Sequence, residues 1–339
     1  MNPTLSNQPL LDGICRRGVL VSTSVRYWRG RKRLNAEDLG LDPANVSERL
    51  IQLGHKRLVP RDALAAFALI ESRVNATVES SSFPFLGGIA RFVPNARLGD
   101  LTDRLDKLRE EFREATLDFV AGYGPLREQA MNEWREAATH LSGSSERLIL
   151  TIEQSFPPAG DITKRFALET RLFQIAAPDS IRLEVAEGLE QMEVAEDRRR
   201  IADDASRRLQ SDLDVFVRES VASLRQETAQ LASEVLATID NSGNGVHQRT
   251  LNRLSGFIDS FRTLNFAGDQ QLEQTLERFR RDLLQRRAED YRNNSSAMAS
   301  LTDGLARLRE NAVQLAKGDA REVIARFGQL GARKLAAVS

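Results

Sequence analysis

The sequence predicts a mostly α-helical protein: a helical bundle with a long antiparallel coiled-coil hairpin and a small N-terminal α+β portion. The run from Ile181 to Asp240 contains no proline and a single glycine, Gly188, so it predicts one helix of roughly 90 Å. The polar stretch 241–245 then holds two glycines and indicates a turn. Because helical periodicity resumes after this turn, we expect the chain to return beside the first helix.

The N-terminal portion has the character of strands. Residues 18–28 are rich in β-branched and aromatic side chains, which favour a strand. A second strand is expected at 89–93, because Gly87 and Gly88 precede it and Pro94 follows it. These two strands can pair with each other.

Helical periodicity dominates the segments around and after these strands. Apolar residues repeat at helical spacing over 60–80 and again over 101–119. The Gly-Tyr-Gly-Pro sequence at 122–125 is expected to end the second of these helices. Further helices are expected over 126–140 and 148–156.

These elements predict an order of domains along the chain. They are a flexible N-terminus over 1–12, a small α+β head over 13–95, a helical body over 96–177, the hairpin over 178–294, and C-terminal helices packing on the body over 295–339. The same heptad positions can be filled within one chain or by a second copy, so the sequence leaves a homo-oligomer open.

Composition limits the class of protein. The chain has 339 residues, of which 41% are hydrophobic, enough for a sizeable core. Lys plus Arg number 48 and so do Asp plus Glu, so no overall charge draws the whole chain to nucleic acid or to an anionic membrane. Cys15 is the only cysteine, and neither a signal peptide nor a membrane-spanning stretch is recognisable. We therefore expect a cytoplasmic protein.

The sequence indicates no site for catalysis. His55, His140 and His247 are far apart and have no cysteine or carboxylate at the spacing of metal ligands. The glycine-rich motifs of P-loop and dinucleotide-binding proteins are absent from the sequence. We expect no enzyme activity, no catalytic residue, no metal and no cofactor.

One run interleaves aromatic with basic residues, a composition that can bind phosphates and stack on bases or lipid headgroups. Its candidate residues are Arg26, Tyr27, Trp28, Arg29, Arg31, Lys32 and Arg33. The alternative, which we favour, places both aromatic side chains in a small core and leaves the basic residues on an exposed strand end or turn.

An apolar loop over 83–89 is a second candidate, with Phe83, Phe85 and Leu86 as its large side chains. Such a loop can enter a membrane in helical pore-forming toxins. A buried hairpin is the favoured interpretation, because exposed side chains of this kind promote association. At the expected hairpin tip, Asn244 and His247 are candidate contacts for a protein partner.

The N-terminal region resembles a bacterial family known as a domain of unknown function, DUF3150. The resemblance rests on Gly18-Val19-Leu20-Val21, Trp28-Arg29-Gly30, the 34–40 stretch with Asp38-Leu39-Gly40, Leu53-Gly54 with Lys56, and Phe92-Val93-Pro94. It implies a genomic setting near AAA+ ATPases similar to cobaltochelatase and MoxR subunits, and near proteins with von Willebrand A domains. It implies no catalytic residues.

We therefore expect a non-catalytic helical scaffold or adaptor, with the AAA+ ATPase and the von Willebrand A protein as the partners that the resemblance implies. One alternative is a nucleic-acid-binding module that uses 26–33. The other is a membrane-active helical protein that uses 83–89.

Overall fold

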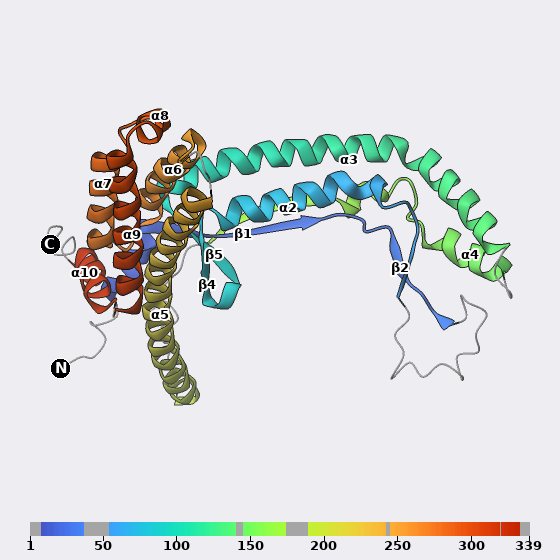
Figure 1. The fold of residues 1–339 in the computed structure, drawn as a ribbon. Helices are drawn as coiled ribbons and strands as arrows, with labels where there is room; N and C mark the ends of the chain where they lie inside the picture. The colour runs from blue at the N-terminus through green and yellow to red at the C-terminus, as the bar shows by residue number, and fades with distance from the viewer. Residues whose placement is uncertain are drawn as a thin grey trace. The chain divides into compact units, whose positions relative to one another are not determined.

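The computed structural model describes residues 8–36, 54–139, 145–173, 189–241, 245–318 and 320–332, and Figure 1 labels its elements. Ten α-helices and six short β-strands lie in these ranges. The mostly helical fold with a small α+β portion is therefore confirmed.

The chain divides into two compact units. Unit 1 consists of Met1–Val21, Ser81–Gly99 and Leu172–Ser339, and unit 2 consists of Ser22–Ser80 and Asp100–Arg171. Each unit joins segments that are distant in sequence, whereas the predicted domains follow one another along the chain.

A small antiparallel sheet belongs to unit 1. The first residues of β1 (Gly18–Arg26) pair with β5 (Ala90–Pro94), with Gly18 opposite Pro94. On its other edge β5 pairs with β4 (Phe83–Phe85). The predicted pairing of the two strands is confirmed. Glycine is needed at position 18, because a Cβ there would lie 2.4 Å from the backbone oxygen of Val93.

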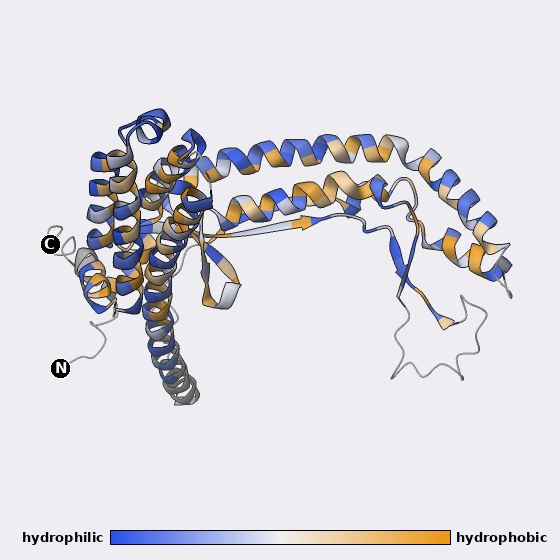
Figure 2. Ribbon diagram, in the orientation of Figure 1, coloured by the Kyte–Doolittle hydropathy of each residue, from blue (hydrophilic) through white to orange (hydrophobic). Residues whose placement is uncertain are grey.

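Seven helices of unit 1 share one hydrophobic core. They are α1 (Gln8–Arg17), α5 (Leu189–Asn241), α6 (Gln248–Leu264), α7 (Gln270–Leu283), α8 (Ala288–Arg292), α9 (Ser295–Lys317) and α10 (Arg321–Ala332). Among them, α5 packs most extensively against α9, and α1 packs against α10. In Figure 2, α7 is hydrophilic on its outer side and hydrophobic toward its neighbours, as expected of a bundle helix.

The N-terminal helix α1 begins within the stretch that the sequence assigned to a flexible N-terminus. Leu10 and Leu11 are 9% and 7% exposed, and Ile14 is 1% exposed. These three side chains follow helical spacing, so burying them in the core of unit 1 stabilises the helix.

The neighbours of α5 differ from the expected ones. The segment that was to return as one limb of a hairpin is divided into α6, α7 and α8, and α9 supplies most of the packing. Between α6 and α7 the chain turns at Gly268, whose φ is +75°. The described residues just before α6 are packed on unit 1: Val246 is 1% exposed, and a Cβ at Gly245 would lie 2.8 Å from Cε of Met298. Helix α5 has 53 residues, and it contributes buried side chains to the core from Leu213 to Ile239.

Unit 2 is built around helices that pack on an aromatic core. Its elements are the second half of β1, β2 (Arg31–Arg33), β3 (His55–Arg57), α2 (Ala65–Glu79), most of α3 (Asn95–Ala138), α4 (Ser145–Ser155) and β6 (Ala167–Phe173), which lies next to β1. Short 3-10 turns occur at Asp62–Leu64 and Ile162–Arg165 in this unit, and at Leu86–Gly88 in unit 1.

One helix of unit 2 is longer than the sequence predicted. Helix α3 continues through Gly122, Gly124 and Pro125, where we expected it to end. Proline inside a helix removes one backbone hydrogen bond and bends the helix without necessarily ending it. Figure 1 shows α3 bending along its length. None of the helices in the described ranges is both long enough and apolar enough to cross a bilayer.

Candidate anion-binding ribbon

Two three-residue strands of unit 2 form an antiparallel ribbon in which every residue is basic. This basic ribbon consists of β2 (Arg31–Arg33) and β3 (His55–Arg57). Its opposite pairs are Arg31 with Arg57, Lys32 with Lys56, and Arg33 with His55. Like charges directly opposite each other destabilise a sheet by up to about 1 kcal/mol per pair. Repulsion between opposite side chains therefore disfavours the pairing of β2 with β3.

The register fixes which side chains share a face. Side chains alternate along a strand, so Arg31, Arg33, Arg57 and His55 lie on one face of the ribbon. All four are exposed. Opposite Cβ atoms in such a pair are about 5 Å apart, and next neighbours on one face are roughly 7 Å apart. One face thus concentrates three guanidinium groups and an imidazole.

The second face carries Lys32 and Lys56. Lys32 is exposed, whereas Lys56 is only 5% exposed and has an interaction of its own. Within the part of the chain that the structure describes, no carboxylate forms an ion pair with the guanidinium groups of the ribbon. By contrast, several arginines on α2 and α3 have carboxylate partners: Arg73 with Glu111, Arg104 with Asp100, Arg109 with Asp106, and Arg113 with Glu110.

Backbone hydrogen bonds extend the ladder past both ends of the ribbon. The N–H of Leu58 donates to the carbonyl of Gly30 at 2.7 Å, and the N–H of Leu34 donates to the carbonyl of Gly54 at 3.0 Å. The connecting residues 37–53 lie outside the described residues. Their sequence contains four acidic residues and one basic residue.

Hydrophobic burial anchors the ribbon to unit 2 and offsets the repulsion within it. Leu58 and Val59, which follow β3, are 1% and 4% exposed. Gly30 has a φ of +57°, and a Cβ there would lie 2.7 Å from Cγ2 of Val59, so only glycine fits this approach. The indole N–H of Trp134 on α3 donates to the carbonyl of Arg57 at 2.9 Å.

Tyr27 and Trp28 lie in the core of unit 2 and not on the ribbon. Tyr27 is 8% exposed and stacks on Phe67 with ring centroids 5.5 Å apart. The ring of Trp28 lies 5.9 Å from that of Tyr123 and 6.0 Å from that of Phe156. Their aromatic faces are used by the protein, so these two residues do not offer a stacking platform. The favoured interpretation of this run also placed both aromatic side chains in a small core.

Arg29 is also engaged within unit 2. Its guanidinium donates to both carboxylate oxygens of Glu71, at 2.9 and 2.7 Å, and lies 3.8 Å from the centroid of the Tyr27 ring. The hydrogen bonds from Arg29 lower the pKa of Glu71, and the same bonds raise the pKa of Arg29. Arg29 thus fixes the chain between β1 and β2, while Arg26 lies exposed at the end of β1.

A family model described as "Protein of unknown function (DUF3150)" matches residues 16–245. The chain belongs to this family. The matched region includes the basic ribbon and extends to the turn after α5. Neither a curated protein nor a solved structure matches the chain.

In the apolar loop 83–89 of this DUF3150 protein, two phenylalanines are packed in unit 1 and the other five residues are exposed, with Ile89 at 84%. Phe83 and Phe85 are 5% and 1% exposed, and their rings lie 5.4 Å from Phe266 and 4.9 Å from Phe216. Leu86, which follows β4, is 38% exposed. The two phenylalanines therefore serve the core, and the membrane alternative is not favoured.

The remaining candidates, Asn244 and His247, follow α5 in the sequence. His247 is exposed and precedes α6 in an extended conformation, without a side-chain hydrogen bond to the helix end. Asn244 lies outside the described residues. No three His, Cys, Asp or Glu side chains of the described ranges gather where they could hold a metal ion.

The second strand of the basic ribbon, β3, was not identified from the sequence. His55, Lys56 and Arg57 were not nominated because they follow Arg33 only after a long connection. A signal was nevertheless present: a second basic triplet stands between Gly54 and two apolar residues, as a short strand would.

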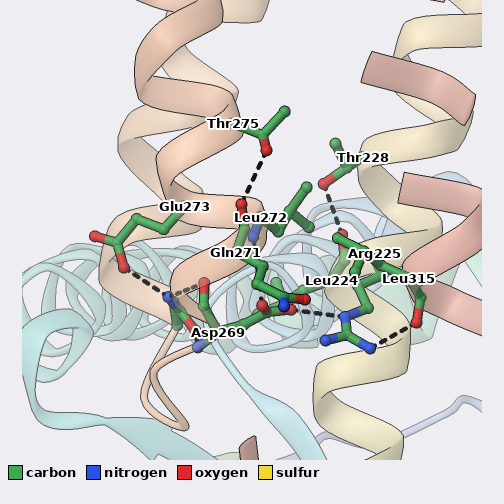
Figure 3. Close-up of polar contacts among 10 residues, drawn as sticks. Leu224, Arg225, Thr228, Asp269, Gln271, Leu272, Glu273, Thr275 and Leu315 are labelled. Atoms are coloured by element: carbon green, nitrogen blue, oxygen red, sulfur yellow. Dashed lines mark hydrogen bonds and ion pairs between the residues drawn. The ribbon is translucent and has the colours of Figure 1, made fainter. Parts of the chain in front are cut away.

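Among the described residues of unit 1, the most buried ion pair is structural (Figure 3). Nε of Arg225 on α5 lies 2.7 Å from Oδ2 of Asp269, and the two side chains are 4% and 2% exposed. Nη1 of Arg225 also donates to the carbonyl of Leu315 on α9 at 2.6 Å. Asp269 caps α7 by accepting from the N–H of Leu272 at 3.4 Å. This pair ties α5, α7 and α9 together.

Proposed function

We propose that the protein is a non-catalytic binding protein whose basic ribbon engages the phosphate backbone of nucleic acid. The observation that carries this proposal is the register, in which a basic residue faces a basic residue at all three positions. An anion bound at the face of Arg31, Arg33 and Arg57 supplies a counter-charge to these three guanidinium groups, which form no ion pair with a carboxylate of the described ranges.

The chemistry of the exposed groups suits phosphate. Guanidinium groups donate paired N–H bonds to phosphate oxygens, and such charge-assisted bonds are stronger than neutral ones. Contacts from arginine and lysine to phosphates supply much of the affinity of proteins for nucleic acid. Arg31, Arg33 and Arg57 are the three residues that we assign to these contacts.

The test compares two variants that remove the same charge from the same unit. The ribbon variant replaces Arg31, Arg33 and Arg57 with glutamine. The control variant replaces Arg104, Arg109 and Arg113 on α3 with glutamine, because these arginines already have carboxylate partners. Binding to a fluorescently labelled nucleic acid is measured by anisotropy.

We expect the ribbon variant to lose at least about a hundredfold in affinity at low salt, since three phosphate contacts are removed. The control variant should bind almost as the wild type does. Equal weakening of both variants, or no binding by the wild-type protein, would contradict the proposal.

The second candidate function is that of an adaptor for an AAA+ ATPase and a von Willebrand A protein, as the family resemblance implies. The feature that favours it is the length of α5, which has 53 residues. From Leu213 to Ile239 this helix contributes buried side chains to the core. A helix of this length that is anchored in a core can span the distance to a second protein.

The adaptor candidate is tested by affinity purification of the tagged protein from its own host, with and without a non-hydrolysable ATP analogue. Mass spectrometry identifies the partners. Enrichment of an AAA+ ATPase or a von Willebrand A protein supports this function. Purification of the protein without either partner under both conditions argues against it.

A further inference from the structure

We infer that the nucleic acid bound by the basic ribbon is duplex DNA and that the ribbon enters its major groove. This inference rests on the proposed nucleic-acid function and specifies the class of ligand.

The aromatic residues argue against a single-stranded ligand. Proteins that bind single strands combine a basic groove with aromatic rings on which successive bases stack. Beside the ribbon, Tyr27 and Trp28 place their rings against Phe67, Tyr123 and Phe156 in the core. The N–H of Trp134 is held by a ribbon carbonyl, and one partly buried ring is not a platform for successive bases.

The dimensions of the ribbon suit a groove of B-form DNA. A strand of three residues is about 10 Å long, and two paired strands lie about 4.8 Å apart. The major groove of B-DNA is about 12 Å wide and admits a two-stranded β-ribbon. The major groove of duplex RNA is deep and narrow, so side chains cannot read it. The width of the major groove therefore favours duplex DNA over duplex RNA as the ligand.

The distribution of charge shows which face of the ribbon is available to a groove. Arg31, Arg33 and Arg57 are exposed on one face. The other face carries Lys32, which is exposed, and Lys56, which is 5% exposed and has an interaction of its own. The second face is therefore partly covered by the protein, and we place the face with the three arginines toward the bases and phosphates of the groove.

The experiment is a competition assay with the full-length protein bound to a labelled DNA duplex. The competitors are the unlabelled duplex, each of its single strands, and an RNA duplex of the same sequence, at equal phosphate concentration. Counterion release alone favours duplex DNA over single strands by roughly tenfold at low salt for about four phosphate contacts. We expect at least this preference, and weaker competition by duplex RNA.

A second readout locates the groove. Methyl green, which occupies the major groove, should displace the protein, whereas distamycin, which occupies the minor groove, should not. Replacing Arg31, Arg33 and Arg57 with lysine keeps the charge and should retain most of the binding. This variant shows that a loss in the glutamine variant reflects charge and not misfolding.

The failures of the two proposals are distinguishable. If single strands or duplex RNA compete as well as duplex DNA, or if distamycin displaces the protein, the duplex inference is overturned and the nucleic-acid function stands. If the wild-type protein binds none of these nucleic acids, or if the glutamine variant binds them equally well, the proposed function itself is overturned.

Discussion

Replacing Arg225 with methionine should strongly destabilise unit 1. The change leaves the carboxylate of Asp269, whose side chain is 2% exposed, without its counter-charge. Breaking a buried ion pair in this way costs about 3–5 kcal/mol, because an uncompensated charge stays in the interior. The carbonyl of Leu315 also loses the 2.6 Å hydrogen bond from Nη1. In a unit of roughly 200 residues, such a loss lowers Tm by about 6–20 °C.

A double-mutant cycle isolates the energy of the pair. Asp269→Asn keeps an oxygen that can cap α7 but leaves the guanidinium of Arg225 without an anion. The double variant Arg225→Met/Asp269→Asn removes both charges together. Its loss of unfolding free energy should be smaller than the sum of the two single losses by roughly 2–3 kcal/mol.

The assay is urea denaturation and thermal unfolding followed by circular dichroism. The matched control is Arg218→Met, on the same helix, whose ion pair with Asp214 at 2.6 Å is exposed. Exposed pairs contribute about 0–1 kcal/mol, so this variant should unfold almost as the wild type does. A loss of less than about 1 kcal/mol for Arg225→Met, or strict additivity in the cycle, would refute the reasoning.

Three further changes have expected outcomes. Gly30→Ala should lower the unfolding free energy of unit 2 by about 1–3 kcal/mol, because φ is +57° and the new methyl group would lie 2.7 Å from Val59. Tryptophan fluorescence during urea denaturation measures this loss, since Trp28 and Trp134 both belong to unit 2. Arg29 lowers the pKa of Glu71, so the stability that this ion pair adds is present above about pH 4.5 and is lost as the pH falls through the lower pKa of the folded state. Glu71→Gln should therefore flatten the fall of Tm with acidification, and an unchanged fall would contradict the assignment. Amide substitution of the four acidic residues in 37–53 removes negative charge from the segment that connects the two strands of the ribbon in sequence. It should tighten nucleic-acid binding at low salt and have less effect at high salt, as anisotropy would show.

The strands and helices that were predicted well carry local signals. The pairing of β1 with β5 followed from β-branched residues bounded by glycine and proline. The basic ribbon carries the opposite signal, because lysine is depleted in strands and three residues are too few to show alternation. Its pairing depends on burial of Leu58 and Val59 and on the close approach at Gly30, which only the folded chain reveals.

The periodicity of apolar residues could not predict which helix packs against α5. Its heptad-like apolar positions suit any helix with a complementary apolar face, and both α6 and α9 have one. In the folded chain α5 packs most extensively against α9. The expected returning limb is divided between α6 and α7, where Phe266 and Ala267 are 6% and 4% exposed and Gly268 turns the backbone. Pro125 illustrates the same limit, because packing along α3 overrides the local signal to end the helix.

The salt dependence of duplex DNA binding tests the central claim most directly. The logarithm of the binding constant is plotted against the logarithm of salt concentration for the wild type and for the variant with Arg31, Arg33 and Arg57 replaced by glutamine. Each phosphate contact contributes a slope of about −0.9, so the wild-type slope should be steep and the glutamine slope shallower by about 2.7. The lysine variant should keep the wild-type slope. Equal slopes for the wild type and the glutamine variant would contradict the assignment of the basic ribbon as the phosphate-binding surface.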